Sequence, residues 1–152
     1  MTLDVVNVAL GARSYEVRIG RGLIAQAGKH IAPLLRRKKV AVITDDTVAA
    51  RHLMDLAKAL EQEGIVMTAL TIPPGESSKG WEQFARSVEW LLEQKIERRD
   101  VVIAFGGGVV ELRFQHHLTE LFEVHPLHRR PIGTACVYTG QRQQLAGLAG
   151  RG

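Results

Sequence analysis

The sequence contains a single cysteine, Cys136, and has no long hydrophobic run. One cysteine excludes an internal disulfide and is typical of a protein from a reducing compartment. A helix that crosses a bilayer needs roughly 20 consecutive apolar residues, and no run approaches that length. No secretory signal opens the chain either. We therefore expect a cytoplasmic protein that makes no contact with a membrane.

Charge of one sign does not dominate the chain. It has 20 Lys and Arg against 16 Asp and Glu, a net charge of +4. The one basic run, 36–39, directly precedes an expected strand, where four charges are more typical of a solvated loop than of a nucleic-acid groove. We expect no nucleic-acid partner. With 152 residues, 45% of them hydrophobic, the chain is long enough to form a globular core.

The last 42 residues differ in composition from the rest. They contain no Asp, Lys or Asn, but hold four of the six histidines. We therefore divide the chain into an ordered α/β part, residues 1–110, and a tail, residues 111–152. The tail is expected to be irregular, with a helix over 111–124 and a low-complexity end over 145–152.

Residues 1–110 alternate between strand and helix patterns. A β-hairpin is predicted over 5–19, and apolar residues then recur at helical spacing over 23–35. Strands are predicted over 39–44, 65–72 and 101–105, with helices between them. The helix over 81–95 is expected to turn Phe84, Val88, Leu91 and Leu92 inward. The order predicts an α/β fold: a Rossmann-like, mostly parallel sheet flanked by helices, with an N-terminal β-hairpin.

A glycine turn follows the last of these strands. The strand is entirely apolar and leads directly into Gly106, Gly107 and Gly108. A strand that runs into such a turn is typical of folds in which backbone N–H groups and a helix N-terminus face a pyrophosphate. The Gly-x-Gly-x-x-Gly pattern is not completed, because Glu111 occupies its last position. The residues alone leave nucleotide binding and a plain tight turn both open.

Two other loops follow strands that would end at the same edge of the sheet. Asp45 and Asp46 come after the first parallel strand, where they can cap the next helix or accept hydrogen bonds from ribose hydroxyls. Glu76 and Lys79 come after the second, one helical turn apart. That spacing suits either an exposed ion pair or two groups that share a crevice.

The three loops together resemble the N-terminal NAD-binding domain of 3-dehydroquinate synthase. They read Thr44-Asp45, Pro74-Gly-Glu-Ser-Ser-Lys79 and Gly106-Gly-Gly-Val-Val110. The family converts 3-deoxy-arabino-heptulosonate 7-phosphate to 3-dehydroquinate with release of phosphate, in the shikimate pathway to aromatic amino acids. It uses NAD catalytically together with a divalent metal, zinc or cobalt.

The resemblance implies a set of NAD-binding residues. Asp45 would contact the adenosine ribose with Thr47 close by, and a loop containing Gly75, Glu76 and Lys79 would line the site. The glycine turn would hold the pyrophosphate, through Gly106, Gly107, Gly108, Val109 and Val110.

The sequence departs from the family after Val110. The family continues with Gly-Asp, whereas this chain has Glu111-Leu112, and the Thr-Thr loop, the catalytic lysines and the metal-binding domain have no counterpart. We therefore assign no catalytic residue and no metal ligand, and expect the chain alone to be inactive. A shifted reading frame would explain the tail. A sheet face left uncovered after the glycine turn is expected to favour self-association or a homodimer.

Chemistry in the tail is not favoured. His116 and Glu120 could share a helix face, but Pro126 interrupts the later histidine pair, and a surface cluster is the better interpretation. Cys136 has no His or acid arranged around it in the sequence. Two alternatives to the synthase stay open. One is the nucleotide-binding part of a related sugar-phosphate cyclase or metal-dependent alcohol dehydrogenase, and the other is a non-catalytic α/β binding module.

Overall fold

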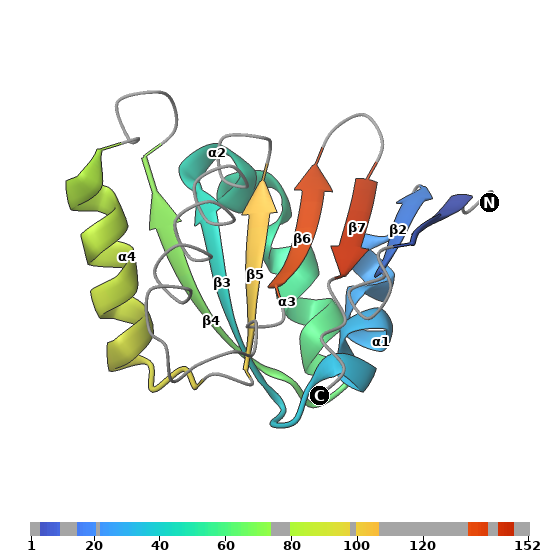
Figure 1. Ribbon diagram of the computed structural model, residues 1–152, viewed down its shortest axis with the longest axis horizontal. Helices are drawn as coiled ribbons and strands as arrows, with labels where there is room; N and C mark the ends of the chain where they lie inside the picture. The colour runs from blue at the N-terminus through green and yellow to red at the C-terminus, as the bar shows by residue number, and fades with distance from the viewer. Residues whose placement is uncertain are drawn as a thin grey trace.

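The computed structural model describes residues 4–9, 15–20, 22–73, 80–97, 100–106, 134–139 and 143–147. Within these residues, seven strands form one sheet in the order β1-β2-β7-β6-β5-β3-β4 (Figure 1). The strands are β1 Asp4–Val8, β2 Tyr15–Gly20, β3 Lys39–Asp45, β4 Val66–Ile72, β5 Val101–Gly106, β6 Thr134–Thr139 and β7 Gln143–Gly147.

The sheet has a parallel half and an antiparallel half. Strands β4, β3, β5 and β6 pair in parallel, whereas β1 and β2 form the antiparallel hairpin. Strand β7 joins the halves by pairing antiparallel with both β2 and β6. The α/β class, the parallel strands and the N-terminal hairpin are confirmed.

Helices cover both faces of the parallel half. They are η2 Ile24–Gln26, α1 Ala27–Ile31, η3 Ala32–Leu34, α2 Asp46–Val48, a π-helical turn η4 Ala49–Leu53, α3 Met54–Glu61 and α4 Trp81–Glu93. As predicted, Pro33 lies where the first helical segment ends. Gly64 follows α3 with a φ of 69°, a left-handed conformation that glycine adopts without strain.

Successive side chains along each strand point to opposite faces of the sheet, so the buried residues form two separate cores. Val42 and Ile103 face α1 and α3, where eleven buried residues form one cluster. Ile43 and Val102 face the opposite side, toward Leu91 of α4, in a smaller cluster of five. All six residues of β5 are buried, as expected for a central parallel strand covered on both faces.

Gly28 sets the distance between α1 and α3. A Cβ atom built on Gly28 would lie 2.1 Å from the carbonyl oxygen of Ala59 and 2.9 Å from Cγ of Glu63. Any side chain at this position would therefore push the two helices apart. On the sheet side of α1, Arg18 of β2 donates a hydrogen bond to Nδ1 of His30 and so ties the hairpin to the helix.

The orientation predicted for α4 is partly wrong. Phe84 and Leu91 are buried as expected, but Leu92 is 69% exposed and Ser87 is buried instead. Positions 84, 87 and 91 follow one line along the helix, and Leu92 lies about 100° around the axis from Leu91. Ser87 tolerates burial because its hydroxyl donates to the carbonyl oxygen of Gln83 at 2.9 Å.

The expectation of an irregular tail is wrong for two segments, Thr134–Thr139 and Gln143–Gly147, which form β6 and β7. The first is rich in Thr, Val and Tyr, which favour strands. The second has no such preference and is paired between β2 and β6. Strand β6 pairs with β5 and extends the sheet beyond it. Self-association through an uncovered sheet face stays a prediction. The helix predicted over 111–124 and the chain beyond residue 147 lie outside the described residues.

Candidate nucleotide-binding edge

The strand order creates a topological switch point between β3 and β5. From β3 the chain passes through α3 to β4 on one side, and then through α4 to β5 on the other side of β3. The two connecting helices consequently lie on opposite faces of the sheet, as the two cores show. In open α/β sheets, ligands bind in the crevice at the carboxyl ends of the strands that flank such a point.

Asp45 and Gly106 lie on either side of this switch point. Thr44 pairs with Phe105 across β3 and β5, so the next residues, Asp45 and Gly106, end their strands at the same level. Asp45 also pairs with Ile72 at the end of β4. Neighbouring strands are about 4.8 Å apart. The structure thus brings together two candidate residues that are 61 positions apart in the sequence.

The Asp45 carboxylate caps the helical segment that follows it. Its Oδ1 accepts a hydrogen bond from the backbone N–H of Val48 at 2.8 Å, which confirms the capping prediction. A carboxylate has two oxygens and about four acceptor positions, so capping through Oδ1 leaves acceptor capacity for a ribose hydroxyl. Thr47 is exposed on α2, two residues further on.

The remaining candidates lie outside the described residues. These are Gly75, Glu76 and Lys79 of the second loop, together with Gly107, Gly108, Val109 and Val110 of the glycine turn. The structure fixes their attachment points: β4 ends at Ile72, α4 begins at Trp81 and β5 ends at Gly106. Strands β4 and β5 end at the switch-point edge of the sheet, and α4 begins there (Figure 1). All three attachment points therefore lie at this edge. Glu111, His116, Glu120 and the side chain of Cys136 are likewise not described.

A polar clamp at the opposite edge of the sheet was missed by sequence reasoning. Arg37 donates to Oδ1 of Asp100 at 3.0 Å through Nε and to Oδ2 through Nη2, and it also pairs with Glu97 at 3.5 Å. The Asp100 side chain is 2% exposed and accepts a further bond from the N–H of Glu97 at 2.8 Å. Lys39 donates to the carbonyl oxygen of Gln94. The clamp joins the segments that precede β3 and β5.

The environment of Asp100 keeps it ionised. Burial by itself raises the pKa of this carboxyl, but hydrogen bonds from Arg37 and from the N–H of Glu97, with the charges of Arg37 and Lys39, outweigh burial and lower the pKa below its usual value. Two residues of the basic run, Arg37 and Lys39, therefore have structural partners. A third, Lys38, donates to the carbonyl oxygen of Glu63 at 2.9 Å. These three residues of the run therefore hold neighbouring segments of the fold together.

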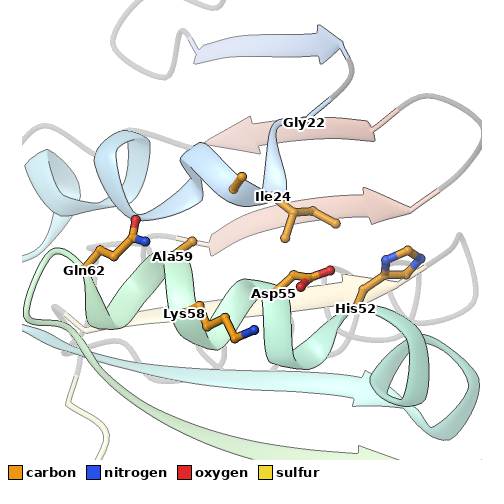
Figure 2. A pocket seen from close by; sticks show the side chains of 8 residues that line it. Gly22, Ile24, His52, Asp55, Lys58, Ala59 and Gln62 are labelled. Atoms are coloured by element: carbon orange, nitrogen blue, oxygen red, sulfur yellow. The ribbon is translucent and has the colours of Figure 1, made fainter.

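A cavity of about 320 Å³ lies between η2 and α3, and none of the predicted site residues lines it (Figure 2). Gly22 and Ile24 form one wall, and His52, Asp55 and Lys58 are spaced along the other. In the described part of the chain, no group of three or more His, Cys, Asp and Glu side chains could hold a metal ion. None of its helices is long and apolar enough to cross a membrane.

The strand order and the helices on both faces define a Rossmann-like α/β fold. A solved 2-deoxy-scyllo-inosose synthase, in complex with carbaglucose-6-phosphate, NAD⁺ and Co²⁺, shares the fold over 90% of this chain and 35% of its own, with a TM-score of 0.70 and 16% identity. A 2-epi-5-epi-valiolone synthase from Streptomyces hygroscopicus, with NAD⁺ and Zn²⁺ bound, matches 60% of this chain and 24% of its own, with a TM-score of 0.51 and 26% identity.

Sequence comparison relates the chain to one enzyme family. The family model for the N-terminal region of 3-dehydroquinate synthase matches residues 69–113. The 3-dehydroquinate synthase of Cereibacter sphaeroides is 66% identical over 110 residues, which are 72% of this chain and 30% of that protein. The matched segment is thus similar in sequence to the N-terminal part of 3-dehydroquinate synthases. The chain spans about 30% of the length of this curated relative.

Proposed function

We propose that the chain is the NAD-binding portion of a 3-dehydroquinate synthase. The observation that carries the proposal is the placement of Asp45 and Gly106 at one switch point, in a segment 66% identical to a 3-dehydroquinate synthase. Both residues are small or acidic groups of the kind that nucleotide sites of this fold use. Solved neighbours that hold NAD⁺ support the choice of dinucleotide.

Each candidate residue has a role in this proposal. Asp45 accepts a hydrogen bond from the adenosine ribose through the acceptor positions of its carboxylate that the cap does not use. Thr47 lies close to the same ribose. The glycine turn, Gly106 to Val110, presents backbone N–H groups to the pyrophosphate. Gly75, Glu76 and Lys79 line the site from the loop between β4 and α4. When bound, NAD would supply reversible hydride acceptance from a substrate alcohol.

The chain by itself is proposed to be inactive in the reaction of the family. The family uses a divalent metal, and among the described residues no group of three or more His, Cys, Asp and Glu side chains could hold one. We assign residues 1–110 to the NAD-binding part and 111–152 to a tail of non-family sequence that arose from a shifted reading frame. Translating the gene in its other frames beyond codon 110 tests this origin. The origin is wrong if neither other frame contains a Gly-Asp or a Thr-Thr segment.

A comparison of two neighbouring carboxylates tests the site. Asp45→Ala should weaken NAD binding about tenfold by calorimetry, because it removes a charged hydrogen-bond acceptor. Asp46→Ala, the exposed neighbour, should bind NAD as the unaltered chain does. Asp45→Asn should lie between them, because an amide oxygen also accepts. Equal affinities for all four proteins would overturn the assignment of the ribose contact.

A related sugar-phosphate cyclase is the second candidate, because the valiolone synthase shares 26% identity and the fold. A phosphate-release assay addresses the activity of the first candidate. With 3-deoxy-arabino-heptulosonate 7-phosphate, NAD and Co²⁺, the chain should release no phosphate above a blank without protein. Release above the blank would contradict the proposed inactivity.

A further inference from the structure

Trp81 is an exposed aromatic residue with no role in the site as proposed above. It is the first residue of α4 and is 73% exposed, which is unusual for a large indole ring. The ring packs against Phe84 with centroids 5.4 Å apart and planes tilted by 46°. Phe84 is buried, so the indole has an anchored neighbour on one side while most of its surface stays open to a ligand.

The position of Trp81 follows from the direction of the chain. Strand β4 ends at Ile72, level with Asp45, and α4 begins at the same edge of the sheet before running back along it (Figure 1). In the proposed site the pyrophosphate lies at the end of β5 and the ribose at the end of β3. The next strand in that line is β4, about 4.8 Å further on.

A base attached to this ribose must extend away from the pyrophosphate. It would therefore lie over the end of β4, beside the first turn of α4, where the exposed Trp81 is found. We propose that Trp81 is a stacking residue for the adenine of the bound dinucleotide, an inference that rests on the proposed function. Indole faces bind bases through stacking that needs no base-specific hydrogen bond.

The two tryptophans of the chain provide a matched pair of probes. Trp90 lies on the same helix, nine residues from Trp81, which is about 14 Å along the axis, and it packs against the smaller core. In Trp90→Phe, NAD should quench the remaining Trp81 emission with the dissociation constant found by calorimetry. In Trp81→Phe, the emission of Trp90 should stay unchanged on NAD addition.

Fragments of the dinucleotide locate the base. ADP should quench Trp81, whereas nicotinamide mononucleotide should not. Trp81→Ala should raise the dissociation constant for NAD about tenfold, within the range that alanine substitution of base-stacking aromatics produces, and Trp81→Phe should recover part of the loss.

Calorimetric NAD binding with no change in Trp81 emission would overturn the stacking role and leave the proposed function intact. Unaltered affinity in Trp81→Ala would do the same. Quenching by nicotinamide mononucleotide but not by ADP would place the other end of the dinucleotide at Trp81 and overturn the adenine assignment. Absence of NAD binding by calorimetry would overturn the proposed function, and the inference with it.

Discussion

Replacing Gly28 by alanine should destabilise the fold by forcing α1 away from α3. The new Cβ would lie 2.1 Å from the carbonyl oxygen of Ala59, whereas ordinary contact begins near 3.4 Å. The helices must therefore separate by more than an ångström, which loosens the larger of the two cores. Overpacking of this kind costs about 1–3 kcal/mol, and the better helix propensity of alanine returns at most about 1 kcal/mol.

The expected net loss is about 1–2 kcal/mol of unfolding free energy, which lowers Tm by roughly 2–8 °C in a chain of this size. Circular dichroism melts and denaturant titrations measure both quantities. Gly80→Ala is the matched control, because a Cβ there meets nothing nearer than 4.0 Å and φ is −73°. If Gly28→Ala proved as stable as Gly80→Ala, the close approach of α1 and α3 would be refuted.

Three other changes give distinct results. Asp100→Asn should cost about 1–3 kcal/mol at neutral pH. Arg37 and the N–H of Glu97 lower the pKa of Asp100 in the folded state. The difference in unfolding free energy between the unaltered chain and Asp100→Asn should therefore persist above about pH 4 and shrink as the pH falls further. A difference that grows in acid would contradict the clamp. Asp45→Ala should lose about 0.5–2 kcal/mol by denaturant titration, since Val48 loses its capping acceptor, whereas Asp45→Asn should not. Glu111→Gly should tighten NAD binding ten- to a hundredfold by calorimetry. Like charges about 5–6 Å apart cost about 3 kcal/mol at an effective dielectric constant near 20, and a carboxylate that turned into solvent would avoid part of that cost. Unchanged affinity would remove the glycine turn from the site.

Runs of consecutive apolar residues correctly predicted the buried parallel strands. The apolar run 101–105 predicted a strand buried on both faces, and Asp45 follows a similar run. The two strands that flank the switch point were therefore predicted from the sequence. Strand β7 was missed because its pairing with β2 joins residues more than 120 positions apart, and its own composition does not favour a strand.

Side-chain partners distant in sequence were equally invisible. Arg37 and Asp100 are 63 residues apart, and within its basic run Arg37 looks the same as its neighbours. The inward direction of Leu92 was misjudged because helical spacing defines an apolar stripe but not which of two adjacent leucines, Leu91 or Leu92, lies at its centre.

Backbone amide signals recorded by NMR during NAD titration test the central claim most directly, that the dinucleotide binds at the carboxyl ends of β3 and β5. The largest shifts should fall on Asp45 and Gly106, with Val48 close behind. Lys39 and Asp100, at the other ends of the same strands, should barely move. Shifts concentrated at Lys39 and Asp100, or spread along α3 near the cavity at Asp55, would contradict the account.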